Sequence, residues 1–317
     1  MLKFPIIHSN KEDFDKHFQS QIWFEAAREI CRRHQIYFTE LKRSPNGEHI
    51  VFFVDDLLII KIYRPFRQCF EREKKALEFI SGKISFKVPE IVQIGEVENF
   101  KYLVMTQLSG ATLTRAAWLD LPEIEQTAIV SELAAGLKSI HSLDADSFAC
   151  DWSEFVEDRA ETFIERQIAR GVNSRIIESL PAFLEANLKL VPKNSSTVFL
   201  HGDVHFGNLR FDKFVGKWQI SGLFDFADSR RGFQEYDFLA VGVLMIQGQA
   251  KIQREFFKSY GYADSELNES FRKRLMMMTM LYETSDLRRY ALRLKPEAVD
   301  FSLEELEKAI WSFANKN

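Results

Sequence analysis

The sequence predicts an α+β protein, with a small β-rich N-terminal lobe, residues 1–105, followed by a larger, mainly helical C-terminal lobe, residues 106–317. Two observations lead to this fold class. Before residue 106, most apolar residues fall in short runs of the length and composition of strands. After Ser109-Gly110 they recur mostly every three to four residues, as on amphipathic helices. A cleft between two such lobes is a common place for a ligand.

Composition excludes several classes of protein. Of 317 residues, 46% are hydrophobic and 28% charged, which is typical of a folded chain and not of a disordered one. The net charge of −4 gives no basic excess for nucleic acid. No run approaches the roughly 18 apolar residues of a membrane span, and residues 1–10 lack the apolar core of a signal peptide. The three cysteines show no paired spacing that would indicate disulfide bonds. We therefore expect a cytoplasmic protein with no nucleic-acid or membrane partner; nothing specifies its oligomeric state.

In the N-terminal lobe, apolar residues at every fourth position predict a helix over 12–34. The period then changes, and strands are predicted at 36–41, 50–54 and 57–63, a helix at 69–80, and strands at 91–97 and 102–105. In the C-terminal lobe, helices are predicted at 122–141, 152–170, 174–190, 234–247, 266–294 and 302–314. Short strands around a turn at Gly216 interrupt them at 197–226.

Lys61 stands inside the almost wholly apolar strand 57–63. A buried cation is costly unless it meets an anion, although a lysine on an edge strand could reach water instead. On the following helix, Glu73 falls on the apolar face with Phe70 and Leu77. Lys61 and Glu73 are thus predicted to form a pair that holds the ammonium group for a phosphate.

The strongest motif is His201-Gly202-Asp203 with Asn208 five residues after the aspartate, followed by Asp225 after a hairpin's length of chain. Phosphoryl transfer needs a base near the attacking hydroxyl and oxygen ligands for Mg²⁺, and this spacing offers both. A rival interpretation makes His201, Asp203 and His205 the metal ligands of a zinc hydrolase. That interpretation gives Asn208 and Lys61 no role.

Over residues 57–240 the chain resembles the aminoglycoside phosphotransferase and choline kinase superfamily, small-molecule kinases with a protein-kinase-like, two-lobed fold. The motifs that carry the resemblance are Ile60-Lys61-Ile62-Tyr63, His201-Gly202-Asp203 through Asn208, Phe224-Asp225-Phe226 and Tyr236-Asp237-Phe238. The His-Gly-Asp element is the most specific of them, and the others occur in the correct order.

The resemblance implies a role for each matching position. It implies Asp203 as the catalytic base and Asn208 and Asp225 as Mg²⁺ ligands. It implies that Lys61 contacts the nucleotide phosphates, with Glu73 orienting it, and that Asp237 supports the catalytic loop. The segment that binds adenine would be Thr106, Gln107 and Leu108. The cofactors implied are ATP and Mg²⁺. Two departures, a glycine-poor turn at 44–49 and Ala227 after the metal-binding segment, leave the choice between ATP and GTP open.

The expected activity is transfer of phosphate to a hydroxyl group of a small molecule, such as an aminoglycoside, an amino sugar, a choline-like alcohol or a related alcohol. Four acidic residues share one face of the helix at 152–170, namely Glu154, Asp158, Glu161 and Glu165. They suit either a polycationic substrate or a solvated face offset by Arg159, Arg166 and Arg170. The alternative function is a catalytically silent, kinase-like nucleotide-binding or scaffold protein, against which the intact set of site residues argues.

Overall fold

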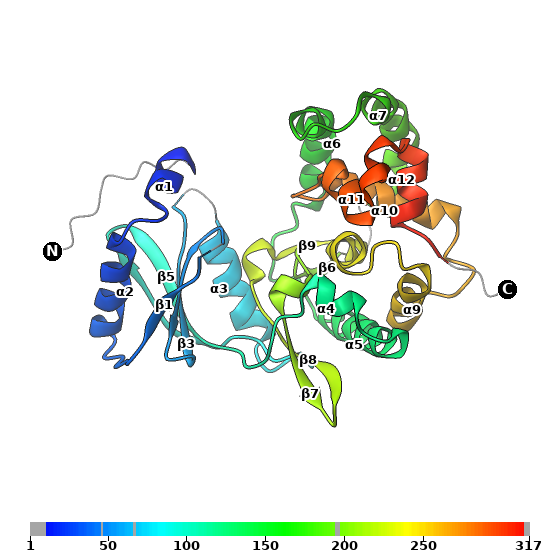
Figure 1. The fold of residues 1–317 in the computed structure, drawn as a ribbon. Helices are drawn as coiled ribbons and strands as arrows, with labels where there is room; N and C mark the ends of the chain where they lie inside the picture. Colours follow the sequence, from blue (N-terminus) through cyan, green and yellow to red (C-terminus); the bar gives the residue numbers. More distant parts are fainter. Residues whose placement is uncertain (1–10, 46, 66–67, 194–196, 314–317) are drawn as a thin grey trace. The chain divides into compact units, whose positions relative to one another are not determined.

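The computed structural model describes residues 11–45, 47–65, 68–193 and 197–313 (Figure 1). Residues 1–10, Asn46 of the turn at 44–49 and residue 314 of the last predicted helix lie outside this range. The chain forms two compact units, one of Met1–Gly110 with Ser221–Asp228 and one of Ala111–Ile220 with Ser229–Asn317. Within the described ranges, every helix is too short or too polar to cross a bilayer.

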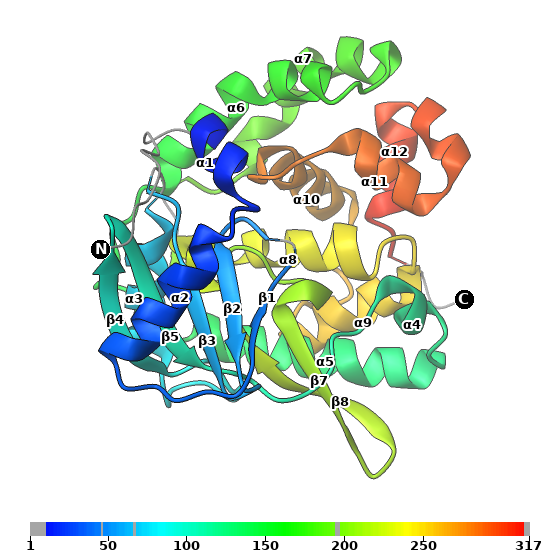
Figure 2. The ribbon, with the colours of Figure 1, turned by 60° about the vertical axis from the view of Figure 1, so that its left-hand side comes forward.

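The first unit is built on an antiparallel sheet of five strands in the order β1-β2-β3-β5-β4. The strands are β1 Leu41–Arg43, β2 Ile50–Val54, β3 Leu58–Ile62, β4 Ile91–Val97 and β5 Phe100–Thr106. Helices α1 (Lys11–His17) and α2 (Ile22–Arg33) lie over one face of this sheet, as Figure 2 shows. Their core includes Trp23 and Phe52, both fully buried.

The alternation of side chains along β3 decides where Lys61 points. Ile60 and Ile62 belong to the core beneath α1 and α2, and successive strand residues face opposite sides of a sheet. Lys61 therefore points to the other face, where it meets a side chain of α3 (Cys69–Ile80). The same sheet thus holds an apolar core on one face and a lysine on the other.

The second unit is mainly helical. Its helices are α4 Arg115–Leu119, α5 Glu123–His141, α6 Trp152–Ala169, α7 Ser174–Asn187, α8 Asp237–Ala240, α9 Ala250–Tyr260, α10 Glu269–Leu281, α11 Leu287–Leu294 and α12 Leu303–Ile310. Strand β6 (Val198–Leu200) pairs with β9 (Arg230–Gly232), and β7 (Leu209–Phe214) forms a hairpin with β8 (Lys217–Leu223). The hairpin links the loop of His201, Asp203 and Asn208 to Asp225.

The strand predicted at 36–41 is wrong, because β1 begins only at Leu41. Gln35 takes a positive φ of 54° at the end of α2, which redirects the chain. The backbone N–H groups of Thr39 and Glu40 then donate to the Asp55 carboxylate at 2.9–3.0 Å and 2.6 Å. A side chain takes the hydrogen bonds that a sheet would otherwise supply.

Three predicted helices are interrupted. The helix at 12–34 is two helices, α1 and α2, and the helix at 266–294 is divided into α10 and α11. The helix at 234–247 is a short α8 between a 3₁₀ turn and a π-helical segment, Val241–Met245. Two helices, α4 and α9, were missed. Tyr282 lies in the break after α10.

Candidate active site

Lys61 forms a buried ion pair in the first unit, as the sequence predicts. Its Nζ lies 2.5 Å from Glu73 Oε2, and both side chains are at most 7% exposed. The hydroxyl of Tyr63 donates to the same Glu73 oxygen at 2.7 Å. Burial alone would lower the pKa of the Lys61 ammonium group. The negative charges of Asp225 and Glu73 have the larger effect, and they raise this pKa. Lys61 is therefore a fixed cation.

Asp225 is the second partner of this lysine. Its Oδ1 lies 2.7 Å from Lys61 Nζ, while 43% of its side chain remains exposed. Its backbone has φ of 67°, a left-handed conformation that few residues other than glycine and asparagine adopt readily. The carboxylate thus contacts Lys61 from a strained turn directly after β8, while a large part of the side chain remains exposed.

Gly222, three residues earlier, lets the end of β8 pass close to its neighbours. A Cβ atom there would lie 2.7 Å from Leu108 Cδ1 and 3.0 Å from the carbonyl oxygen of Lys87. The next residue, Leu223, donates its N–H to that same carbonyl at 2.9 Å. A close backbone approach, which only glycine permits, therefore sets the path of the chain into Asp225.

The predicted adenine-binding segment lies at the end of β5. The N–H of Thr106 donates to Glu90 O at 2.9 Å, and that of Gln107 donates to Leu57 O at 2.8 Å. The N–H groups of Thr106 and Gln107 are therefore both hydrogen-bonded to backbone oxygens of the first unit. Leu108 follows them, and its N–H donates to no group within the described ranges.

Asp203 belongs to the second unit and is held at both carboxylate oxygens. Tyr282 Oη donates to Oδ1, and His205 Nε2 lies 3.2 Å from Oδ2. His205 Nδ1 accepts the Gly207 N–H at 2.9 Å, so in the neutral ring the proton is on Nε2 and faces Asp203. Burial raises the pKa of Asp203, but the hydrogen bonds from His205 and Tyr282 leave it below its usual value. The carboxyl group is ionised.

Asn208 lies beside this aspartate. Its Nδ2 donates to the Asp203 backbone oxygen at 2.9 Å, and only 6% of the residue is exposed. With the nitrogen committed to that carbonyl, the amide oxygen Oδ1 points elsewhere. The structure therefore joins Asp203 and Asn208 in one loop, as their spacing predicts.

A buried aspartate supports that loop from below. Asp237 accepts the N–H groups of His201 and Gly202 at 2.9 and 2.7 Å, and it also contacts His141 Nε2 at 3.0 Å. His141 in turn bonds Tyr260 Oη at 2.8 Å. Asp237 is 1% exposed, so its charge depends on such donors, and the two N–H contacts hold the backbone just before Asp203 in place. Its predicted supporting position is confirmed.

The zinc-hydrolase interpretation finds no ligand set in this region. His201 is fully buried, and its Nδ1 accepts the Asp203 N–H at 3.2 Å. Across the described part of the chain, no three His, Cys, Asp or Glu side chains converge as metal ligands would. His201 thus serves the loop's own backbone.

Sequence reasoning missed the two tyrosines that contact site carboxylates. Tyr63 follows the lysine strand by two residues and was read only as part of an apolar run. Tyr282 lies far along the chain, in the break between α10 and α11, and no motif marks it. A buried tyrosine needs a partner for its hydroxyl, which is the signal that a sequence could have offered.

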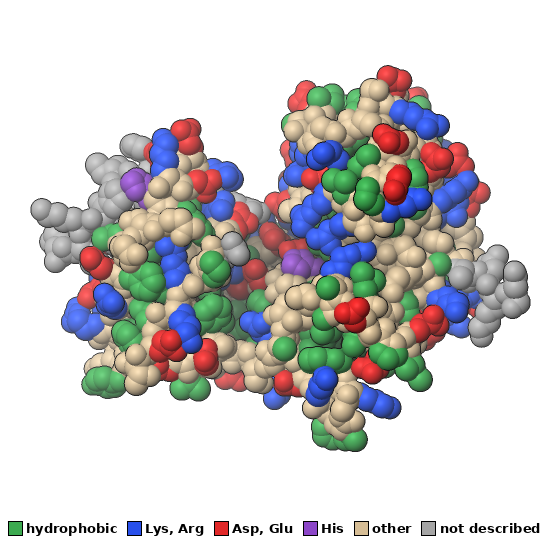
Figure 3. Space-filling model, viewed as in Figure 1, with side chains coloured by type: hydrophobic (Ala, Val, Ile, Leu, Met, Phe, Trp, Pro, Cys, Tyr) green, Lys and Arg blue, Asp and Glu red, His purple; other side chains and the backbone are tan. Residues whose placement is uncertain are grey.

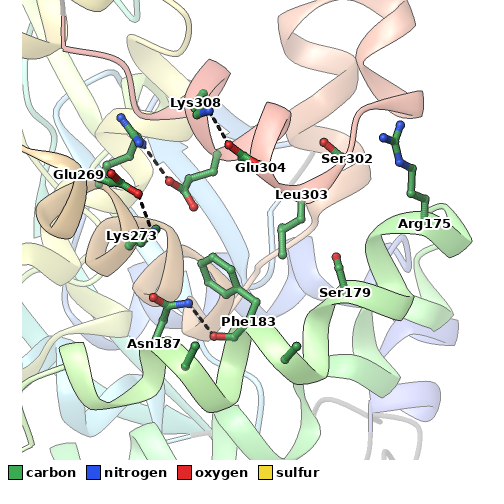
Figure 4. Close-up of a pocket in the computed structure, with 14 residues that line it drawn as sticks. Arg175, Ser179, Phe183, Asn187, Glu269, Lys273, Ser302, Leu303, Glu304 and Lys308 are labelled. Atoms are coloured by element: carbon green, nitrogen blue, oxygen red, sulfur yellow. Dashed lines mark hydrogen bonds and ion pairs between the residues drawn. The ribbon is translucent and has the colours of Figure 1, made fainter.

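A cavity of about 860 Å³ between α7, α10 and α12 holds none of the predicted site residues (Figure 4). Its charged lining is largely paired internally, for example Lys273 with Glu269 at 2.8 Å and Arg272 with Glu307 at 2.9 Å. Acidic and basic groups alternate around it, so no single charge of ligand is favoured there. The chemistry of the site lies in the residues described above.

The acidic residues of α6 are exposed, which agrees with a solvated face. Glu154, Asp158, Glu161 and Glu165 are all exposed. Of the arginines expected to offset them, Arg159 lies 3.9 Å from Asp158, and Arg170 is exposed. Arg159 and Arg166 are half-buried and contact Glu283, between α10 and α11.

Comparison with known proteins gives one family and many similar structures. The model of the phosphotransferase enzyme family matches residues 42–271. Among curated protein sequences, none matches this chain. The GDP and kanamycin complex of APH(2'')-IIIa is 13% identical over 90% of this chain and 98% of its own, with a TM-score of 0.70.

Two further solved structures are similar to this chain over most of its length. ADP-bound aminoglycoside phosphotransferase APH(2'')-Ib is 19% identical over 89% of this chain and 98% of its own, with a TM-score of 0.61. Macrolide 2'-phosphotransferase type I is 17% identical over 93% and 99%, with a TM-score of 0.59. These likenesses confirm the predicted fold class, an α+β, protein-kinase-like fold with a small antiparallel sheet and a mainly helical C-terminal region.

Proposed function

Because this chain belongs to the phosphotransferase enzyme family, we propose that it transfers the terminal phosphoryl group of ATP to a hydroxyl group of a small molecule, in a reaction that needs Mg²⁺. The family makes the chain a phosphotransferase, and the similar structures include complexes with GDP, ADP and ATP. The observation that carries the proposal is Asp203, an ionised carboxylate held at both oxygens and still 25% exposed.

The N-terminal lobe, 1–105, is the nucleotide clamp in this proposal. Lys61 contacts the α- and β-phosphates, and Glu73 and Tyr63 fix its position from behind. At the end of β5, the segment Thr106–Leu108 borders the adenine ring. The free N–H of this segment within the described ranges is that of Leu108, which we assign as the donor to the base.

The C-terminal lobe, 106–317, supplies the base. Asp203 accepts the proton of the acceptor hydroxyl as the oxygen of that hydroxyl bonds to the terminal phosphorus and the bond to the ADP oxygen breaks. A low pKa keeps Asp203 ready to accept a hydrogen bond and orient the hydroxyl. Asp237 supports the loop and takes no part in the transfer.

Asn208 and Asp225 fit Mg²⁺ by the chemistry of their donors. Mg²⁺ takes oxygen ligands, and here the Asn208 amide nitrogen is committed to the Asp203 backbone while its oxygen is not. The exposed part of the Asp225 carboxylate is the second ligand. When bound, the ion would neutralise charge on the nucleotide phosphates.

Calorimetric titration of nucleotide with and without Mg²⁺ tests the assignment. The wild type should bind ATP more tightly with Mg²⁺ present, and Asp225→Ala should lose this dependence. Asp212→Ala, an exposed aspartate of β7, is the control and should behave as the wild type. Unchanged Mg²⁺-dependent binding in Asp225→Ala would refute the metal role. Mg-ATP binding without transfer to any acceptor in a substrate panel would instead favour a silent binding protein.

A further inference from the structure

Three arginine side chains converge on Glu283, the residue after Tyr282. Glu283 Oε1 lies 3.5 Å from Arg159 Nη2, and Oε2 lies 3.0 Å from Arg230 Nη2. Arg166 Nη1 donates to the Glu283 backbone oxygen at 3.5 Å. Asp158, which is 70% exposed, comes no nearer to Arg159 than 3.9 Å. Positive charges therefore outnumber negative ones here, even when Asp158 is counted.

Aromatic rings pack against two of these arginines, Arg159 and Arg230. The Arg230 guanidinium lies 4.0 Å from the ring centre of Phe155, and that of Arg159 lies 5.4 Å from the same ring. Tyr236 Oη accepts the Glu283 N–H at 3.1 Å, so Glu283 is fixed as well. The arrangement is a built cluster and not a set of mobile surface side chains.

Some hydrogen-bond donors of the arginine cluster have no acceptor within the cluster. The Nε atoms of Arg159, Arg166 and Arg230 are buried and have no hydrogen-bond partner within the described ranges. Arg230 is only 9% exposed. Burial, with Arg159 and Arg170 adding to it, lowers the pKa of Arg166, which agrees with an excess of positive charge. A cluster of this kind is short of one anion.

The arginine cluster is connected to Asp203, the proposed base, through Tyr282. Tyr282 donates its hydroxyl to Asp203, and its backbone continues directly into Glu283. The rings of Tyr236 and Tyr282 are 5.5 Å apart, which joins the arginine cluster to the catalytic loop. The residue on which the arginines converge is thus the direct neighbour of a residue that contacts the proposed base. Figure 3 shows Lys and Arg side chains gathered over α6 and α11 of this unit.

We propose that the acceptor carries an anionic group, such as a carboxylate, which binds the cluster of Arg159, Arg166 and Arg230. The inference rests on the proposed phosphotransferase function and narrows its acceptor. The planar guanidinium group matches the two oxygens of a carboxylate, and it repels an ammonium group. A polycationic acceptor is thereby disfavoured, because its ammonium groups would meet the three arginines.

Three related sugars of different charge test this: glucuronate, with an anionic carboxylate at C6, neutral glucose, and glucosamine, with a cationic amine at C2. Each is titrated calorimetrically into the full chain with Mg²⁺ and a non-hydrolysable ATP analogue, and phosphoryl transfer from ATP is followed in parallel. Glucuronate should bind about tenfold or more tightly than glucose, and glucosamine should bind most weakly. Arg159→Gln should abolish the preference, and Arg159→Lys should retain part of it.

The control is Arg175→Gln, on α7, where the arginine is 69% exposed and lies 3.9 Å from Glu305. It should keep the wild-type order of affinities. Equal, reversed or absent binding of the three sugars at millimolar concentration would overturn the inference. The inference would also be overturned if Arg159→Gln lowered the affinity for ATP but kept the preference for glucuronate over glucose. If glucuronate binds through Arg159 and no acceptor is phosphorylated, the anion site stands and the phosphotransferase proposal falls.

Discussion

Tyr282 Oη donates a hydrogen bond to Asp203 Oδ1, from a break between two helices 79 residues further along the chain. His205 holds the other oxygen of the same carboxylate at 3.2 Å. Both contacts favour the ionised form of Asp203, since a carboxylate accepts hydrogen bonds and loses one acceptor site when protonated. The position and the ionisation of the proposed base thus depend on the same two neighbours.

Removing the tyrosine hydroxyl should shift the pH profile of the enzyme. Tyr282→Phe deletes a hydrogen bond that lowers the pKa of Asp203, so the pKa of this carboxyl group should rise. The base is active when ionised, and therefore the acidic limb of kcat/KM moves to higher pH. The measurement is kcat/KM against pH with any acceptor that the wild type phosphorylates. Tyr262→Phe, which removes a hydroxyl bonded to Glu235 at 2.9 Å, should leave the limb in place.

Breaking the buried ion pair should cost stability in the first unit. Glu73→Gln leaves the Lys61 charge buried with one partner fewer, and the free energy of unfolding should fall by about 3 kcal/mol. Urea unfolding at neutral pH measures it. The matched control is Glu269→Gln, which breaks an exposed pair with Lys273 and should leave stability unchanged. Equal effects of the two substitutions would contradict the role assigned to burial.

Asp237→Asn should weaken the catalytic loop without touching the proposed base. An amide offers one acceptor oxygen where the carboxylate accepts the His201 and Gly202 N–H groups on separate oxygens. We expect a loss of about 3 kcal/mol in unfolding free energy and a lower kcat. Thermal unfolding together with steady-state kinetics checks this. A variant as stable as the wild type would show that the loop is held by other contacts.

The sequence predicted what spacing and periodicity encode. Lys61 and Glu73 could be paired because the strand pattern placed one inside a sheet and the helical period placed the other on an inner face. Asp203 and Asn208 could be joined because five residues of loop keep them together. Each of these predictions needed only local geometry.

What could not be predicted depends on contacts between distant segments. The strand at 36–41 failed because the Asp55 side chain takes its backbone donors, a choice that strand propensity does not contain. The helix predicted at 266–294 is divided after Leu281, and Tyr282 in the break contacts Asp203, a distant partner that helical periodicity does not contain. The arginines of α6 were expected to offset its acids. Arg159 does lie 3.9 Å from Asp158, but its contact with Glu283 depends on tertiary structure and was not predicted.

The most direct test of the central claim is replacement of the proposed base, Asp203→Ala, in the full chain. Phosphoryl transfer from Mg-ATP to a panel of small-molecule hydroxyl compounds is measured beside calorimetric binding of the nucleotide. The account predicts that transfer falls by at least about a hundredfold while the dissociation constant of Mg-ATP stays within about threefold of the wild type. Transfer at the wild-type rate in this variant would contradict the assignment of Asp203.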